Sequence, residues 1–274
     1  MPELPEVETI LRTLKPKVLG RTIERVEVLL NKVIREPDAE QFVKDTSGRA
    51  LIGVERRGKY LLFKLTGSLV MVVHLRMTGR LLYVAPDLPR DQYTHVVFYL
   101  DNGKELRFHD MRRFGTIDLI PAGRLKTFHS LNKLGPDALD PSLTRDVFKK
   151  RLKGRTGQIK KILLDQTFIT GIGNIYANEI LWKARIHPER SAASLTPRDL
   201  GRLYHAMREV LMTAIDHRGT TIRDYVDGEG KPGSFQELLA VHGRENQPCP
   251  LCGNSIVRVK NGGRSAYFCP SCQK

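Results

Sequence analysis

Four cysteines near the carboxyl end constrain the fold of this chain more than any other feature. They are the only cysteines among 274 residues, and they form two Cys-x2-Cys pairs separated by sixteen residues: Cys249 with Cys252, and Cys269 with Cys272. In a reducing compartment this spacing predicts one Zn²⁺ ion and not disulfides. Because thiolates would fill all four tetrahedral positions, we expect a single structural zinc with no open site for catalysis.

The residues between the two cysteine pairs are suited to a β-hairpin that brings the pairs together. Ser255 to Lys260 and Arg264 to Phe268 are the expected strands, and Asn261 to Gly263 supply the turn. The sequence therefore predicts a zinc-ribbon hairpin as the core of a zinc finger over residues 245–274.

The charge of the chain points to a polyanionic partner. There are 45 Lys and Arg against 30 Asp and Glu, a formal charge of +15, which favours nucleic acid but does not distinguish DNA from RNA or ribosome. Hydrophobic residues make up 41%, enough for real cores. No signal peptide precedes Pro2 and no apolar run approaches the roughly 20 residues of a membrane span. We expect a cytoplasmic protein with no membrane partner.

Residues 1–120 have the pattern of a β-sandwich domain. Apolar residues at helical spacing from Val7 to Val18 predict a first helix, and a short one is expected near Asp38 to Lys44. Short β-rich runs without intervening helices follow, which is typical of a sandwich. The expected strands are Thr22–Leu30, Ala50–Glu55, Lys59–Leu65, Leu69–Leu75, Leu81–Val84, Thr94–Leu100, Glu105–Phe108 and Thr116–Ile120.

The second half of the chain changes to helical periodicity, so the predicted fold class is α+β. Prolines and glycines mark a linker over residues 121–143, and a helical domain is expected over residues 144–244. Glycines with few apolar anchors predict a mobile loop over residues 218–234. The expected helices are Thr144–Leu152, Thr156–Leu164, Gly173–Ala184 and Thr196–His217.

The first six residues, Met1 to Glu6, have the composition of a reactive terminus. If Met1 is removed, as the small Pro2 side chain favours, a secondary amine with a reference pKa of about 8 remains. Its attack on a sugar C1′ gives an iminium that keeps its positive charge and promotes β-elimination. Glu3 and Glu6 would supply general acid and base groups. The alternative is a processed terminus that opens a helix, where Glu is favoured by the macrodipole.

Several motifs together resemble the formamidopyrimidine-DNA glycosylases, bacterial repair enzymes that remove oxidised purines. They are Pro2–Thr9 (PELPEVET), His74–Gly79 (HLRMTG), Asp110–Gly115 (DMRRFG) and Gly171–Tyr176 (GIGNIY). The resemblance extends over the whole chain. It implies a bifunctional glycosylase and lyase for 8-oxoguanine and formamidopyrimidines, with Schiff-base chemistry at Pro2, β,δ-elimination, and a helix-two-turn-helix motif in the helical domain.

The same resemblance assigns roles to individual residues. Pro2, Glu3, Lys59 and Arg264 are the implied catalytic residues. Met77, Arg112 and Phe114 correspond to the trio that fills the void left by an extruded base. Taken singly, each of these residues would more often be core or a solvated surface group. The remaining implied DNA contacts are Glu6, His74, Asn174, Tyr176, Arg223, Asp224 and Arg258.

The chain departs from the family pattern at three positions. His242 stands where many members have Tyr, and Ala266 and Asp224 stand where Thr is usual. These departures put individual contacts in question, including the lesion preference. One alternative is an endonuclease VIII-like enzyme for oxidised pyrimidines, although that family has Gly where this chain has Leu4. The other is a non-catalytic zinc-ribbon protein that binds nucleic acid by charge. The resemblance favours a monomer that acts on damaged double-stranded DNA in the bacterial nucleoid.

Overall fold

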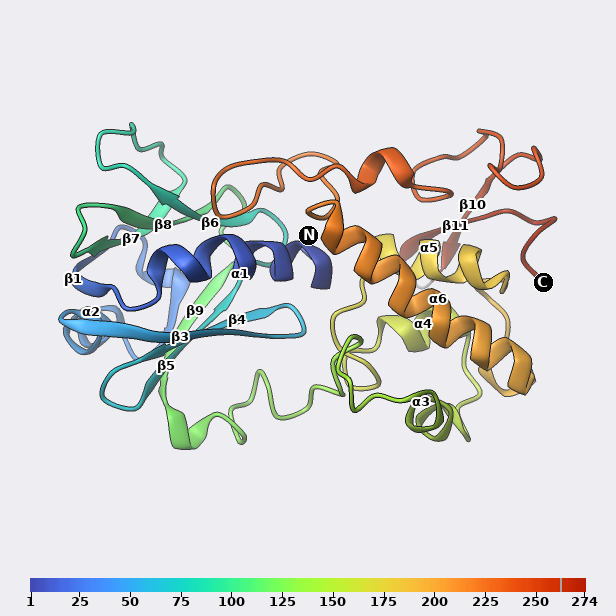
Figure 1. Ribbon diagram of the computed structural model, residues 1–274, viewed down its shortest axis with the longest axis horizontal. Helices are drawn as coiled ribbons and strands as arrows, with labels where there is room; N and C mark the ends of the chain where they lie inside the picture. The colour runs from blue at the N-terminus through green and yellow to red at the C-terminus, as the bar shows by residue number, and fades with distance from the viewer. Residues whose placement is uncertain (262) are drawn as a thin grey trace. The chain divides into compact units, whose positions relative to one another are not determined.

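A computed structural model of the chain describes residues 1–261 and 263–274, which divide into two compact units. The first unit contains residues 1–132 and 217–234, and the second contains residues 133–216 and 235–274. Strands dominate the first unit and helices the second, so the α+β class predicted from the sequence is confirmed (Figure 1).

The first unit is built on nine hydrogen-bonded strands in the order β2-β9-β5-β4-β3-β1-β7-β8-β6. Eight of them match the predicted runs to within a few residues, whereas the short β2 was not predicted. The strands are β1 Thr22–Val28, β2 Ile34–Glu36, β3 Arg49–Arg57, β4 Tyr60–Leu65, β5 Leu69–His74, β6 Gly79–Val84, β7 Thr94–Leu100, β8 Glu105–Asp110 and β9 Thr116–Pro121.

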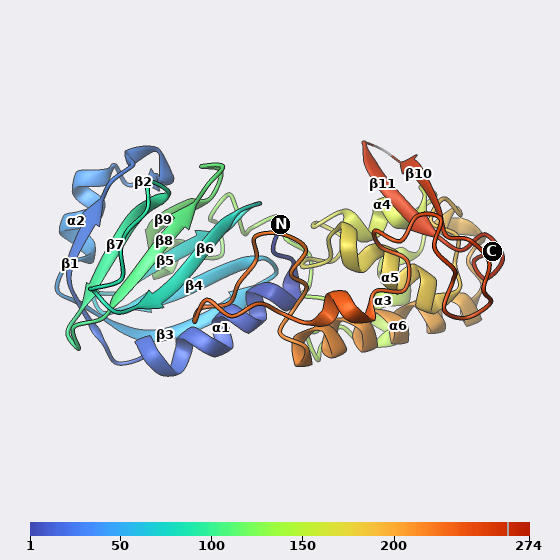
Figure 2. The same cartoon turned by 90° about the horizontal axis from the view of Figure 1, so that it is seen from above.

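The two halves of this sheet lie as two layers with one core between them (Figures 1 and 2). Phe63 on β4 and Phe98 on β7 belong to opposite halves and to the same buried cluster. Helix α1 (Leu4–Val18) contacts β3 and β4 on one side and β6 on the other. Its buried face repeats Val7, Ile10, Leu14 and Val18 at helical spacing, so its apolar stripe completes the core. The unit also contains α2 (Ala39–Thr46) and the 3₁₀ turns η1 (Asn31–Val33) and η2 (Ala122–Arg124).

Residues 217–234 belong to the first unit, although the sequence placed the loop 218–234 in the helical domain. Hydrogen bonds and an ion pair hold it there, and Tyr225 packs against the core cluster of this unit. The Tyr83 N–H donates to the Gly228 carbonyl at 2.9 Å, and the Gly228 N–H donates to Oγ1 of Thr13 at 3.1 Å. Lys17 on α1 also pairs with Glu229 at 2.7 Å. These contacts attach the segment to α1 and β6.

The second unit is helical apart from its carboxyl-terminal hairpin, as predicted. Its elements are α3 Arg145–Leu152, α4 Ile159–Leu164, α5 Asn174–Ala184, η3 Ala192–Ser194, α6 Pro197–Asp216, η4 Phe235–Leu238, β10 Val257–Asn261 and β11 Arg264–Phe268. Strands β10 and β11 pair antiparallel. Gly262, in the expected hairpin turn, lies outside the described residues. Within the described residues, no helix has the length and apolar character needed to cross a membrane.

Candidate active site and metal centre

The residues that follow the exposed Met1 are buried at the start of α1. Pro2 is buried, and Glu3, the N-cap residue of α1, is only 2% exposed. The Glu3 N–H donates to Oε2 of Glu6 at 2.7 Å, and the Thr220 N–H donates to Oε1 of Glu6 at 2.7 Å. The Glu6 carboxylate therefore joins the first turn of α1 to the 217–234 segment. Its implied contact with DNA stays a prediction.

Two features keep the 217–234 segment close to Glu6. Gly219 has a φ of +82°, and a Cβ at this position would lie 2.8 Å from Oε1 of Glu6, so only glycine fits. The Tyr225 hydroxyl lies 3.3 Å from the Glu6 carbonyl and 3.0 Å from the Arg218 carbonyl. Burial, reinforced by the negative charge of Glu6, raises the pKa of Tyr225, so this phenol stays protonated as a donor.

Lys59 and His74 lie where the adjacent strands β4 and β5 begin and end in the first unit. Both side chains are buried, Lys59 just before β4 and His74 at the end of β5, where His74 pairs with Tyr60. Burial lowers the pKa of His74 to about 3, and the positive charges of Arg76 and Lys59 add to the effect. His74 is therefore neutral near pH 7. Its Nδ1 accepts the Arg76 N–H at 2.9 Å, which leaves Nε2 as the protonated nitrogen.

Met77, Arg112 and Phe114 form one cluster although they come from two different loops. Nη1 of Arg112 lies 3.1 Å from the Met77 sulfur, and its guanidinium carbon lies 5.0 Å from the centre of the Phe114 ring. Met77 and Phe114 are 43% and 51% exposed, which is unusual for large apolar side chains. The cluster thus presents apolar groups and a cation together on the surface of the first unit.

Asp110 holds the two loops that carry this cluster. Its buried carboxylate accepts the Thr78 hydroxyl at 2.5 Å through Oδ1 and the Gly115 N–H at 2.6 Å through Oδ2. Arg76 and Arg113 flank the cluster with φ values of +54° and +56°, conformations that non-glycine residues rarely adopt. Such conformations persist where the surrounding structure enforces them, often at functional sites. Asp110 begins the Asp110–Gly115 motif but was not predicted as a site residue.

Arg223 and Asp224 lie in the 217–234 segment of the first unit. Arg223 is exposed, and Oδ1 of Asp224 lies 3.9 Å from Nη2 of Arg80 on β6. Asp224, one of the three departures from the family pattern, therefore adds an ion pair that a threonine would not make. The implied DNA contacts of both residues stay predictions.

The Gly171–Tyr176 turn opens α5 in the second unit. Gly171 has a φ of +107°, which favours glycine, and its N–H donates to Oε1 of Gln166 at 3.0 Å. Nε2 of Gln166 donates to the Ile172 carbonyl at 2.8 Å, so one side chain fixes the turn. Gly173 is the N-cap and Asn174 the first helical residue, where the positive end of the helix dipole favours an anion. Tyr176 is fully buried against Phe235.

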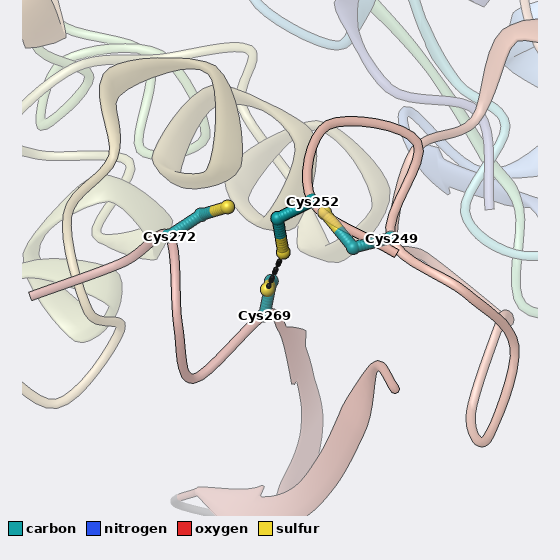
Figure 3. Close-up of side chains that lie close together, drawn as sticks. All are labelled: Cys249, Cys252, Cys269 and Cys272. Carbon is teal, nitrogen blue, oxygen red and sulfur yellow. Dashed lines mark hydrogen bonds between the residues drawn. The ribbon is translucent and has the colours of Figure 1, made fainter. Parts of the chain in front are cut away.

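The four cysteines converge on one point in the second unit. Their sulfur atoms all lie within 4.8 Å of one another, and Figure 3 shows them pointing toward a common centre. The Sγ atoms of Cys252 and Cys269 are 3.5 Å apart, and none of the four cysteines is in a disulfide. Four sulfur ligands at about 2.3 Å from a tetrahedral ion fit this spacing, so these residues can hold one structural zinc.

One polar contact attaches the zinc hairpin to α4, and another links the two strands of the hairpin. Nζ of Lys160, on α4, donates to the Ser265 carbonyl at 2.7 Å, next to the exposed Arg264. Lys160 is fully buried and was not predicted from the sequence, which offered only helical spacing at this position. On β10, Nε of Arg258 donates to the Ser265 hydroxyl at 3.0 Å. Arg258 and Arg264 thus lie on facing strands of one hairpin, as expected.

The other two departures from the family pattern are accommodated inside the second unit. Burial and the charge of Lys160 lower the pKa of His242 to about 4, so the ring is neutral near pH 7, and its Nδ1 accepts from Nδ2 of Asn178 at 2.8 Å. Ala266 is fully buried on β11. Both residues therefore have roles in packing the hairpin.

Three domain families together match nearly the whole chain. They are the formamidopyrimidine-DNA glycosylase N-terminal domain over residues 1–117, the formamidopyrimidine-DNA glycosylase H2TH domain over residues 134–226, and the zinc finger found in FPG and IleRS over residues 246–274. The order and extent of these matches agree with a sheet unit, a helical unit and a terminal zinc hairpin.

Full-length relatives give the same assignment. The chain is 52% identical over 274 residues to the formamidopyrimidine-DNA glycosylase of Pelotomaculum thermopropionicum, covering 100% of this chain and 99% of that protein. It is 50% identical to the same enzyme of Desulforamulus reducens, with the same coverage. Among solved structures, a Lactococcus lactis FPG variant in complex with Fapy-dG containing DNA matches with a TM-score of 0.94 and 34% identity over 100% of both chains. The chain therefore belongs to the formamidopyrimidine-DNA glycosylase family.

Proposed function

We propose that this chain excises oxidised purines from duplex DNA and then cleaves the strand at the resulting abasic site. The observation that carries the proposal is the cluster of Met77, Arg112 and Phe114, in which Arg112 contacts both exposed apolar side chains. Extruding a base leaves unstacked neighbours, and inserted apolar groups recover part of the few kcal/mol that unstacking costs. A surface cluster of this composition is suited to that task, and the relatives act on the same class of lesion according to their names.

The chemistry is assigned to the amino terminus. Once Met1 is removed, the lone pair of the Pro2 nitrogen attacks C1′ while the glycosidic bond breaks and its electrons leave with the base. Glu3 donates a proton to O4′ as the C1′–O4′ bond breaks, and its carboxylate takes the proton that the nitrogen loses, which leaves an iminium at C1′. Loss of a proton from C2′ turns the iminium into an enamine, whose electrons expel the 3′ phosphate. Loss of a proton from C4′ then expels the 5′ phosphate in a second elimination. Hydrolysis of the iminium returns the free amine.

Supporting contacts are assigned to the other predicted residues. Lys59 and Arg264 provide positive charge for the phosphates next to the lesion, and Asn174 lies where the α5 dipole favours a phosphate. Zinc, held by the four cysteines, would fix the hairpin that carries Arg258 and Arg264. We place the protein in the cytoplasm, acting as a monomer on damaged duplex DNA in the nucleoid.

Borohydride trapping tests the central step of the proposal. Reduction in the presence of abasic duplex should crosslink the protein to DNA through Pro2, because only an iminium is reduced to a stable amine. Mass mapping that places the adduct on Lys59 would identify a different nucleophile. Trapping that fails altogether would favour the non-catalytic zinc-ribbon alternative.

Glu3→Gln separates the two activities. The variant should excise 8-oxoguanine at least about a hundredfold more slowly, which is the lower end of the rate loss expected when a general acid is removed. It should retain cleavage of a preformed abasic site. Wild-type rates on both substrates would remove Glu3 from the mechanism. A panel that adds thymine glycol tests the endonuclease VIII-like alternative, which requires preference for the oxidised pyrimidine.

A further inference from the structure

Three side chains of helix α5, those of Asn178, Glu179 and Trp182, contact the segment and hairpin that carry the cysteines. The buried carboxylate of Glu179 accepts the backbone N–H groups of Ala240 at 2.8 Å and of His242 at 2.7 Å, in the segment that leads to the first cysteine pair. Asn178 contacts His242, and its Oδ1 lies 3.5 Å from the backbone nitrogen of Tyr267 on β11. Two of the anchors therefore hold backbone on both sides of the metal centre.

The third anchor reaches a metal ligand directly. Nε1 of Trp182 donates to the sulfur of Cys249 at 3.5 Å, a normal length for a hydrogen bond to sulfur. The Trp182 ring also packs against the cluster formed by Val241, Cys249, Ile256 and Cys269. The contact is thus held by packing as well as by the hydrogen bond.

We propose that Trp182 is a positioning residue of the zinc centre, whose indole N–H fixes the orientation of the Cys249 thiolate and stabilises its charge when the metal is bound. A zinc ion with four thiolates carries net negative charge, and a donor to one sulfur reduces that charge where water has little access. Hydrogen bonds to ionised acceptors are stronger than neutral ones, and partners behind metal ligands tune metal affinity. The same helix begins at Asn174, so α5 also connects the metal centre to the predicted phosphate site.

Cadmium NMR tests the hydrogen bond without altering the protein. Trp182 is the only tryptophan, so its indole N–H gives a single resonance in the full-length chain. With ¹¹³Cd in place of zinc, we expect a scalar coupling between the metal and the indole proton, transmitted through the Cys249 sulfur. Side-chain packing alone produces no such coupling. Its absence in folded, cadmium-loaded protein would overturn the proposal.

Metal release provides the second test. Trp182→Phe keeps an aromatic ring but removes the donor. We expect about tenfold faster transfer of zinc to a chromogenic chelator, which is the lower end of the effects seen when a hydrogen-bond partner of a metal ligand is removed. In the cobalt-loaded variant, the sulfur-to-metal charge-transfer band should shift to lower energy, because the thiolate is no longer stabilised. Tyr267→Phe is the matched control, since it removes a polar atom from a ring that packs on the same cluster.

The outcome is independent of glycosylase activity, because both readouts follow the metal itself. Faster release and a shifted band only in Trp182→Phe support the proposal. Equal zinc release from the two variants, or an unchanged cobalt spectrum, would show that Trp182 serves only in packing. That result would stand even if the chain excises oxidised purines as proposed.

Discussion

Oε1 of Glu6 accepts the backbone N–H of Thr220 at 2.7 Å, across 214 positions of the chain. The other oxygen of the same carboxylate accepts the Glu3 N–H at 2.7 Å. One buried side chain therefore fixes both the start of α1 and the 217–234 segment. In the first unit the proposed nucleophile and this segment are positioned by a common residue.

Glu6→Gln tests this coupling. The amide retains one acceptor oxygen, but its NH₂ group would face one of the two backbone donors. An unsatisfied buried donor costs about 1–3 kcal/mol. We expect faster amide hydrogen exchange across residues 217–234 and a lower rate of 8-oxoguanine excision.

Glu8→Gln is the matched control for this variant. Glu8 lies on the same helix but pairs with Arg12 and Arg56, so its change should leave exchange in the 217–234 segment unaltered. If the two variants give the same exchange in that segment, Glu6 does not hold it.

The neutral His74 predicts a specific acid sensitivity of the first unit. Its folded pKa of about 3 lies below the unfolded value of about 6.5, so the unfolded state binds more protons between these limits. This contribution to the free energy of unfolding is fully present above pH 6.5. It falls by about 1.4 kcal/mol per unit as the pH drops toward 3.

His74→Asn removes this titration and keeps an acceptor for the Arg76 N–H. The difference in urea midpoint between wild type and variant should therefore narrow from pH 7 to pH 5, because only the wild type loses stability through this histidine. The contributions of the other titrating groups are the same in both proteins, so they cancel when the two midpoints are subtracted. A constant difference across this range would show that His74 is not buried in neutral form.

Much of the fold could be predicted from the sequence because its elements have clear periodicity. The Val7 to Val18 stripe and the short β-rich runs are local signals, and the observed α1, β7 and β8 lie where they indicate. The cysteine spacing likewise predicts the convergence of the four sulfurs. The β2 strand has only three residues, so it was too short to be recognised.

The polar contacts that organise the site could not be predicted in this way. Asp110, Gln166 and Lys160 act through partners that only the folded chain brings near them, and a polar residue at helical or strand spacing gives no sign of this. The 217–234 segment shows the same limit. Its glycines predicted a mobile loop, but they did not predict its hydrogen bonds to α1 and β6 or the packing of Tyr225 against the core. The proximity of Met77, Arg112 and Phe114 was expected only through the family resemblance.

Removal of zinc should weaken DNA binding while sparing the first unit. Metal binding and folding are coupled in small four-thiolate hairpins, so a chelator should unfold β10 and β11 and displace Arg258 and Arg264. We expect weaker binding to abasic duplex and a shallower dependence of the binding constant on salt, because fewer phosphates are neutralised. Elemental analysis should find one zinc per chain. Active protein without zinc would contradict the structural role.

We expect Arg112 to discriminate between the bases that can stand opposite the extruded purine. A guanidinium carries only donors, and the pairing edge of cytosine offers O2 and N3 as adjacent acceptors, so both sides are satisfied. Adenine presents a donor beside a single acceptor, which leaves one arginine N–H against another donor. The unpaired group costs about 1–3 kcal/mol. Expressed in the transition state, this is roughly a tenfold to hundredfold difference in rate.

We therefore expect faster excision of 8-oxoguanine opposite cytosine than opposite adenine, and Arg112→Ala should narrow that ratio. The variant also loses the contacts with Met77 and Phe114, so its overall rate should fall on both duplexes, while borohydride trapping on abasic DNA stays detectable because Pro2 is intact. Arg113→Ala is the matched control, since it removes the same charge from the next, exposed position. It should keep the cytosine preference because Arg113 is not assigned to the opposite base. Single-turnover rates on both duplexes measure the ratio, and an Arg112→Ala variant with the full preference would assign the discrimination to another residue.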